Sequence, residues 1–462
     1  MKTIWLILLS LLSASGISAQ GGVARARTDT LKYRITLSDK RATPYSIYSP
    51  QAFLSERAIE RRNRQHLPID STDLPVCQTY IDDIRRQGVH IVLTGKWENF
   101  VTVSCNDTTA VQRIRSLPFV RSAKQVWRKP ADSNHPIPRT RRDTAIYSPT
   151  FYPDSVYGRA GDQLRMSRGD WLHNAGFRGK GMTIAVIDAG FRNVNRIESM
   201  HNIRILGTHN FVTPSVSVFN ADSHGTSVLS CIGMNTPGIM TGTAPDADFW
   251  LLCSEDIQSE YPVEQDYWAA AVEFADSVGA DMVNSSLGYY AFDDSTANIT
   301  YRQLDGRSTL ISRQASHMAN KGIVLVCSAG NTGSGSWKKI APPADADHVL
   351  TVGAIDRRGM LAHFSSIGNT ADGRIKPDVV AIGRSAEVMD ANGSQRHADG
   401  TSFAAPILCG MVACLWQALP SLTAKELIAL VRRLGNRVDA PDNIYGYGIP
   451  DLSQPLRNRL QH

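Results

Sequence analysis

The sequence lacks several features that characterise other classes of protein. Beyond residue 20 no apolar stretch reaches the roughly 18 residues that a membrane-spanning helix needs, so we expect no span there. No C-x-x-C pair is present, which leaves structural zinc without support. The H-E-x-x-H motif of metalloproteases and the G-x-S-x-G turn of lipases and esterases are also absent.

The composition is that of a folded chain. Of the 462 residues, 42% are hydrophobic and 20% are charged. This apolar fraction is too high for an intrinsically disordered protein, and the length allows a sizeable core. Two to four domains, or one large domain with an attachment, are expected.

Residues 1–20 have the layout of a secretory signal. Lys2 gives a positive start, Ile4–Leu12 is apolar, and Ser13–Ala19 is rich in small residues. We therefore predict a cleavable signal at residues 1–19, export to the periplasm or the medium, and no stable membrane anchor. An uncleaved amino-terminal anchor is the alternative.

Cysteine is scarce, and its count is odd. Seven cysteines in an exported protein imply at least one unpaired thiol or an intermolecular bond. Cys327, Cys409 and Cys414 lie in apolar runs, which is typical of buried small side chains. The sequence does not decide whether Cys77 and Cys105 form a disulfide.

Charge divides the chain into two parts of opposite sign. Residues 20–143 hold 22 Lys and Arg against 12 Asp and Glu, whereas residues 144–462 hold 26 against 31. A basic front half could indicate nucleic-acid binding, but the acidic back half favours mutual binding of the two parts. We expect no nucleic-acid partner.

Residues 31–128 alternate short strand-like and helix-like segments. Strands are expected at Tyr33–Leu37, His90–Leu93 and Phe100–Ser104, and helices at Ala52–Arg64, Tyr80–Gln87 and Thr109–Leu117. This succession of strands and helices predicts a small α+β domain over residues 20–127.

Residues 128–164 are predicted to be a linker. Residues 128–153 contain five Pro and the multibasic run Arg139–Arg142, a composition typical of an exposed segment.

From residue 165 apolar strands alternate with longer helices. Strands are expected at Met182–Ile187, Phe249–Cys253, Met282–Asn284, Ile323–Cys327 and Val349–Val352, and helices at Val263–Val278, Ser308–Asn320, Ser402–Ala418 and Thr423–Leu434. This alternation predicts an α/β fold with a doubly wound, mainly parallel sheet over residues 165–455. Functional residues are then expected at the carboxyl ends of the strands.

Four polar residues occupy such positions. Asp188 ends an expected strand, Asn331 follows another, and His224 and Ser402 each open a helix. Each alone has an ordinary explanation: a turn cap for Asp188, a surface position for His224, a turn residue for Asn331 and an N-cap for Ser402.

Together and in this order, these residues resemble the subtilisin-like serine proteases (subtilases). The order Asp, His, Ser along the chain is that of subtilisins and differs from those of chymotrypsin and the α/β-hydrolases. The resemblance covers residues 165–452 and includes Gly242–Pro245, Asn284–Gly288 and Lys376–Asp378. In two departures, Ala189 stands where many members have Thr or Ser, and Phe403 stands where Met is commoner.

The resemblance implies a serine endopeptidase. Ser402 would be the nucleophile, His224 the general base, Asp188 the carboxylate that orients it, and Asn331 an oxyanion donor. A catalytically silent subtilase-fold protein that binds peptides is the alternative, although all four positions hold competent residue types.

The resemblance also implies a substrate site and an inhibitory propeptide, and it implies no required cofactor. Ser286, Leu287 and Gly288 would pair with the substrate backbone, while Ala329 and Gly330 would line the primary specificity pocket. The leading domain resembles the inhibitory propeptide of that family, so a zymogen and a monomeric mature enzyme are expected. No cofactor is required; structural calcium is possible, but its ligands cannot be placed, and no metal-binding residue is predicted.

Two further points concern specificity and maturation. Glu255, Asp256 and Glu260 follow an expected strand and either favour basic substrates or form a solvated loop. Self-cleavage is expected in Arg139–Asp143, with cleavage elsewhere between residues 128 and 165, or by another protease, as the alternative. Because the basic domain is removed, the mature enzyme should be acidic.

Overall fold

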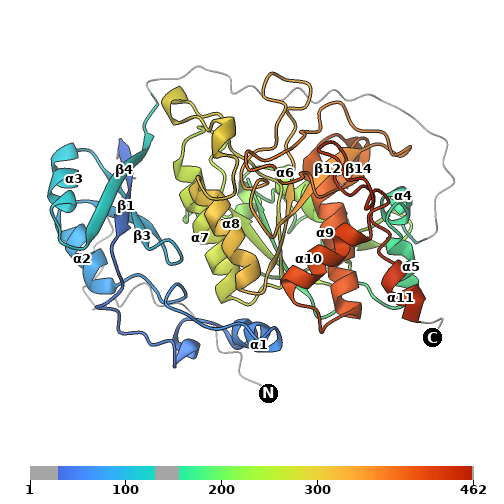
Figure 1. The fold of residues 1–462 in the computed structure, drawn as a ribbon, viewed down its shortest axis with the longest axis horizontal. Helices are drawn as coiled ribbons and strands as arrows, with labels where there is room; N and C mark the ends of the chain where they lie inside the picture. Colours follow the sequence, from blue (N-terminus) through green and yellow to red (C-terminus); the bar gives the residue numbers. More distant parts are fainter. Residues whose placement is uncertain (1–29, 131–155, 460–462) are drawn as a thin grey trace.

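The computed structural model describes residues 30–130 and 156–459, and the fold is given for these residues alone. The predicted signal at residues 1–19 and the multibasic run Arg139–Arg142 lie outside the described residues. Two folded parts lie side by side (Figure 1). We call residues 30–128 the amino-terminal domain and residues 156–459 the carboxyl-terminal domain.

The amino-terminal domain is built on a four-stranded antiparallel sheet in the order β2-β3-β1-β4. Its elements are β1 (Leu31–Leu37), η1 (Pro50–Ala52), α1 (Glu56–Arg64), α2 (Gln78–Arg86), β2 (His90–Gly95), β3 (Phe100–Cys105), α3 (Thr108–Arg115) and β4 (Val120–Arg128). Helices α2 and α3 lie on one side of the sheet, whose other side faces α7 of the carboxyl-terminal domain (Figure 1). The predicted α+β elements are all present, and β4 adds an edge strand whose side chains are mostly exposed.

The carboxyl-terminal domain contains a seven-stranded sheet in the order β13-β12-β11-β10-β5-β9-β6, and every pairing in it is parallel. The strands are β5 (Thr183–Asp188), β6 (Arg204–Asn210), β9 (Asp248–Cys253), β10 (Met282–Ser285), β11 (Val324–Ser328), β12 (Leu350–Ile355) and β13 (Val379–Ile382). This architecture confirms the predicted doubly wound, mainly parallel α/β fold.

Helices cover both faces of this sheet. The helices of the domain, in chain order, are α4 (Gly161–Arg165), α5 (Gly169–Asn174), α6 (His224–Gly233), α7 (Val263–Ser277), α8 (Leu310–Asn320), α9 (Thr401–Ala418), α10 (Ala424–Arg433) and α11 (Gln454–Arg459). Alternate residues of β5 serve the two faces: Ile184 and Val186 pack in the apolar cluster of α6 and α9, whereas Ala185 and Ile187 pack in that of α7 and α8.

Two short hairpins and four 3₁₀ turns complete the domain. They are β7 (Asn235–Thr236) with β8 (Met240–Thr241), β14 (Ala386–Met389) with β15 (Gln395–Ala398), η2 (Glu198–Met200), η3 (Val218–Asn220), η4 (Ser295–Ala297) and η5 (Tyr301–Gln303).

Helix α9 is the central helix of the core. By length and composition it is long and apolar enough to cross a membrane, but 89% of it is buried inside the protein. Its apolar residues therefore serve the fold of this domain.

The structure corrects one expectation about the chain and answers one question that the sequence left open. The predicted linker, residues 128–164, is too long at its carboxyl end, because Tyr157, Ala160 and Leu164 are buried and Gly158 forms a β-bridge with Met240. All seven cysteines are buried free thiols, so no Cys77–Cys105 disulfide is present.

Candidate active site at the carboxyl edge of the sheet

Asp188 and His224 meet at the carboxyl edge of the sheet. Asp188 is the last residue of the fully buried strand β5, and His224 is the first residue of α6. The Asp188 Oδ1 atom lies 2.8 Å from His224 Nδ1 and accepts a hydrogen bond of the same length from the Ala189 N–H. Helix α6 approaches this closely because Gly225 has no side chain: a Cβ there would lie 2.4 Å from the Gly190 carbonyl oxygen.

Ser402 lies in the first turn of α9, beside the segment that follows β10. Its Oγ is 3.4 Å from the Ser286 carbonyl oxygen, and the Ser286 Oγ donates a 2.9 Å hydrogen bond to the Ser402 carbonyl. The neighbouring Phe403 ring packs 5.9 Å from the His224 ring, between ring centroids. Phe403, one of the two departures from the family pattern, therefore joins the starts of α6 and α9 through an apolar contact.

Asn331 follows β11, and its side chain is held in place through its own amide oxygen, Oδ1. Its Oδ1 accepts hydrogen bonds from the Thr401 backbone N–H and the Thr401 Oγ1, both 2.9 Å long. The same hydroxyl accepts from the Gly330 N–H at 3.1 Å. With Oδ1 engaged in this way, the exposed Asn331 side chain presents its amide N–H groups as donors. Thr401 belongs to the Gly-Thr-Ser tripeptide, and only the folded structure shows its contact with Asn331.

The five residues expected to bind substrate lie at the ends of adjacent strands. Ser286, Leu287 and Gly288 follow β10, and Ala329 and Gly330 follow β11. The Leu287 and Ala329 side chains are buried in the apolar cluster of α7 and α8, so these segments offer mainly their backbones to a ligand. Gly330 adopts a positive φ of 107°, and a Cβ there would lie 2.9 Å from the Ser366 Oγ.

Carboxylates gather beside His224. Burial and the nearby charge of Asp188 raise the pKa of Glu255 to about 7, although hydrogen bonds with Glu264 and Tyr289 and the charge of His224 lower it. Burial and the neighbouring carboxylates Glu255, Asp293 and Asp256 raise the pKa of Glu260 to about 9. Glu255 and Glu260 are half-buried, which fits a partly enclosed acidic group better than a solvated loop. Among residues 30–130 and 156–459, no cluster of His, Cys, Asp and Glu has the geometry to hold a metal ion.

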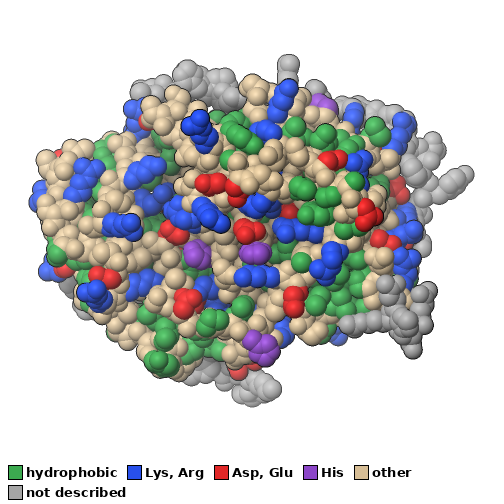
Figure 2. Space-filling model, in the orientation of Figure 1, with side chains coloured by type: hydrophobic (Ala, Val, Ile, Leu, Met, Phe, Trp, Pro, Cys, Tyr) green, Lys and Arg blue, Asp and Glu red, His purple; other side chains and the backbone are tan. Residues whose placement is uncertain are grey.

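The amino-terminal domain binds the acidic side of α7. Asp266 pairs with Arg34 and accepts a 2.7 Å hydrogen bond from the Thr102 hydroxyl. Glu273 accepts hydrogen bonds from the backbone N–H groups of Lys96, at 2.6 Å, and Trp97, at 2.9 Å. The predicted attraction between a basic and an acidic part therefore takes the form of specific contacts. Figure 2 shows Lys and Arg side chains spread over the amino-terminal domain, at the left of the view.

Helix α1 makes a second contact, below α7 and α8 (Figure 1). Arg57 donates to the carbonyl oxygens of Gly279 and Gly181, at 3.0 and 2.8 Å, and pairs with Asp281. Gln65, just after the helix, bonds the Gly322 carbonyl at 2.8 Å.

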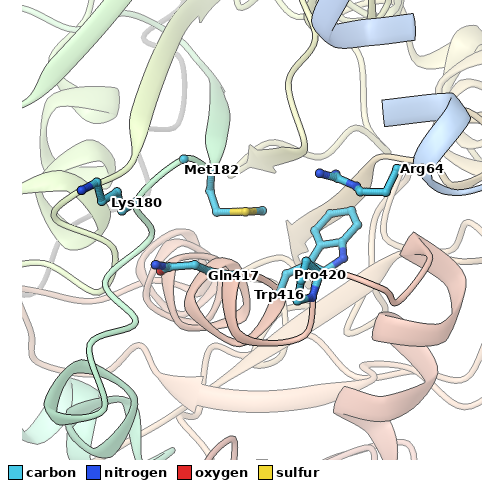
Figure 3. Close-up of a pocket in the computed structure, with 7 residues that line it drawn as sticks. Arg64, Lys180, Met182, Trp416, Gln417 and Pro420 are labelled. Carbon is cyan, nitrogen blue, oxygen red and sulfur yellow. The ribbon is translucent and has the colours of Figure 1, made fainter. Parts of the chain in front are cut away.

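A cavity of about 160 Å³ lies near this contact and far from His224 in the fold. It is lined by Arg64 at the end of α1, by Lys180 and Met182 before β5, and by Trp416 and Gln417 at the end of α9 (Figure 3). Met182 precedes β5, whereas Asp188 ends that strand, so the cavity opens at the amino edge of the sheet. It is therefore separate from the candidate active site.

Sequence comparisons match both domains. Residues 179–448 match the profile described as "Subtilase family", and residues 32–142 match the profile described as "Peptidase S8 propeptide domain, Bacteroidota". Subtilisin DY from Bacillus licheniformis is 27% identical over 268 residues, which cover 57% of this chain and 87% of that protein. Subtilisin Savinase from Lederbergia lenta is 26% identical over 287 residues, which cover 62% and 94%.

Two solved structures are similar in fold. MycP1 with its N-terminal propeptide removed gives a TM-score of 0.51 at 24% identity, covering 64% of this chain and 96% of that chain. The MycP3 protease from the type VII (ESX-3) secretion system gives 0.51 at 21% identity, covering 66% and 89%. Because the sequence identities are only 24% and 21%, the similarity to these two structures shows the fold alone.

Proposed function

This chain belongs to the subtilase family of serine-type endopeptidases, and we propose that Asp188, His224 and Ser402 are its catalytic triad. The observation that carries the assignment is the 2.8 Å contact between Asp188 Oδ1 and His224 Nδ1, with Ser402 at the start of the adjacent α9. We propose further that the enzyme is exported as a zymogen and acts on proteins as a monomer.

The proposed reaction proceeds through an acyl-enzyme. Ser402 Oγ attacks the peptide carbonyl carbon while His224 Nε2 accepts its proton, and the same proton then passes to the leaving amine. Asp188 accepts from His224 Nδ1, which fixes the tautomer with a free Nε2 and stabilises the imidazolium. Water, activated by His224, then hydrolyses the ester and restores Ser402.

The negative charge of the tetrahedral intermediate needs donors that are already in place. The Asn331 amide and the Ser402 backbone N–H would supply them, and the start of α9 adds its favourable dipole. Since Thr401 engages the Asn331 Oδ1, the amide is oriented before substrate arrives.

Replacing Asn331 and Thr401 tests this arrangement. We expect Asn331→Ala to lower kcat by about 10²–10³-fold, the magnitude known for the oxyanion donor of a subtilisin, with KM nearly unchanged. Thr401→Val keeps the backbone donor but removes the hydroxyl, and should lower kcat by about tenfold. Steady-state kinetics on one peptide amide measures both. A change confined to KM would contradict the oxyanion role.

The proposed activity itself is tested with the unmodified protein. The matured enzyme should hydrolyse casein, and a fluorophosphonate probe should label it stoichiometrically and stop the hydrolysis. Folded protein that neither reacts with the probe nor cuts casein would instead be a peptide-binding member of the family.

Maturation gives another prediction. We expect amino-terminal sequencing of the mature enzyme to find a start within or directly after Arg139–Asp143, because this multibasic run lies in the sequence between β4, which ends at Arg128, and the carboxyl-terminal domain. A start before residue 128 or after residue 165 would contradict cleavage between the two domains. Recovery of this form from the medium or periplasm tests export.

A further inference from the structure

The two segments proposed to bind substrate are joined by a pair of stacked aromatic rings. Tyr290 follows the segment Ser286–Gly288, and Trp337 lies in the loop that continues from Gly330. Their ring centroids are 4.9 Å apart, with 17° between the ring planes, and both side chains are half-buried. The loops that leave the ends of β10 and β11 therefore meet through these two rings.

Backbone contacts continue along the same two loops, next to the stack. The Tyr289 N–H donates a 2.9 Å hydrogen bond to the Pro342 carbonyl oxygen. A Cβ on Gly288 would lie 3.2 Å from the Ala341 Cβ, so the Gly288 backbone lies directly against that side chain. The end of the substrate-binding segment after β10 is therefore packed against residues 337–342.

Trp337 is held in place by a hydrogen bond and by apolar packing. Its Nε1 donates to the Ile340 carbonyl oxygen at 3.2 Å. Its ring packs against the apolar cluster of α7 and α8, which contains both Leu287 and Ala329. One residue from each of the two substrate-binding segments thus belongs to the cluster on which Trp337 rests.

The loop that carries Trp337 is itself fastened to the domain. The Thr332 hydroxyl donates to the Lys339 carbonyl oxygen at 3.1 Å, which closes the loop on itself. The Ile367 N–H donates to the Lys338 carbonyl at 2.9 Å, and the Ile340 N–H donates to the Ile367 carbonyl at 3.0 Å. Because these bonds fix the loop to the segment after β12, Trp337 can support the neighbouring Tyr290.

We propose that Trp337, through its stack with Tyr290, is a positioning residue for substrate binding. Gly288 is exposed and lacks a side chain, so its backbone has many accessible conformations unless neighbouring groups restrict it. The stack fixes the end of the segment Ser286–Gly288 before substrate arrives, and substrate binding then does not have to supply the cost of ordering it. This proposal rests on the proposed peptidase activity.

Such a role should depend on the length of the substrate. A peptide amide with several residues before the cleaved bond can pair its backbone with Ser286–Gly288. An N-acetylated single amino-acid ester reaches Ser402 with little backbone left to pair. Loss of the stack should therefore weaken binding of the peptide amide and leave the ester almost unaffected. The chemical step should not change, because the stack belongs neither to the triad nor to the oxyanion donors.

The test compares the mature wild-type enzyme with Trp337→Ala on both substrates. We expect KM for a tetrapeptide amide to rise about tenfold with kcat nearly unchanged, and kcat/KM for the ester to stay within about twofold. Trp337→Phe keeps a ring and should hold KM within about threefold of wild type. Trp171→Ala is the matched control: it removes a half-buried Trp of α5 that packs against the cluster of α6 and α9, and KM should not change. Fluorophosphonate titration gives the active-site concentration of each variant.

The outcomes separate this proposal from the proposed function. An unchanged KM in Trp337→Ala, an equal loss with the ester, or an equally large rise of KM in Trp337→Phe overturns the positioning role of the stack but keeps the peptidase. Absence of both hydrolysis and labelling in the wild-type enzyme overturns the peptidase as well. If Trp337→Ala does not fold, Tyr290→Leu decides: a rise of KM confined to the peptide amide supports the proposal, and an unchanged KM overturns it.

Discussion

A chain carrying Ser402→Ala is expected to accumulate as an uncut zymogen without peptidase activity. Ser402 supplies the only attacking oxygen in the proposed mechanism, and Ala leaves the Asp188–His224 contact and α9 in place. In a subtilisin, loss of the nucleophile lowers kcat by about 10⁶-fold, and the remaining rate comes from the oxyanion donors and substrate binding. Gel electrophoresis of the freshly expressed chain and fluorophosphonate labelling measure the two consequences.

The sequence contains a matched control for this variant. Ser227 closes a second Gly-Thr-Ser tripeptide, is 3% exposed, and lies within α6 rather than at its start. Ser227→Ala should therefore mature and be labelled like the wild type. Equal labelling of the Ser402→Ala and wild-type proteins would contradict the assignment of the nucleophile, whatever the behaviour of the control.

The elements that the sequence predicts best are those that are buried along their whole length. Strands β5 and β11 are buried at every position, so their runs of apolar residues are unmistakable. Strand β6, at one edge of the sheet, is largely exposed and carries Arg, Thr and His, so no apolar run marks it. Strand β13, at the other edge, has only four residues and directly follows the polar Lys376–Asp378 segment.

The candidate site likewise contains residues that the sequence identifies and contacts that it does not. The order of Asp188, His224 and Ser402 along the chain is a sequence property, which is why a family resemblance identifies them together. The hydrogen bonds from Thr401 to Asn331 and the position of Glu255 beside His224 arise when separate strands end at one edge of the sheet. No spacing within the sequence encodes such contacts, so only the fold reveals them.

The contact of the propeptide with the enzyme has a buried ionic centre at Asp276, near the end of α7. Its carboxylate, 0% exposed, pairs with Arg61 of α1, with Arg62 at 2.9 Å and with Lys96 at 3.3 Å. Burial alone would raise the pKa of Asp276, but Arg62, Lys96 and Arg61 together hold it below its usual range. Arg62 also pairs with the Asp73 carboxylate, at 2.8 Å.

Replacing Asp276 by Asn should therefore loosen α1 without changing the shape of the site. Arg61 and Arg62 are 1% and 0% exposed, so they would stay buried with one carboxylate fewer. Removing one partner of a buried ion pair typically costs about 3–5 kcal/mol, or about 10²–10⁴-fold in an equilibrium constant. We expect amide hydrogen exchange in Glu56–Arg64 to accelerate by that factor, measured in the full-length Ser402→Ala chain.

The control for this experiment is Asp439→Asn, a change at an exposed aspartate of the carboxyl-terminal domain. Exchange in α1 should be unaffected by that variant. Equal protection of α1 in the two variants would mean that the Asp276 pairs contribute nothing net, because their desolvation offsets their attraction. Faster exchange only with Asp276→Asn would make this buried cluster, together with the Asp266 and Glu273 contacts, a principal anchor of the propeptide until it is cleaved.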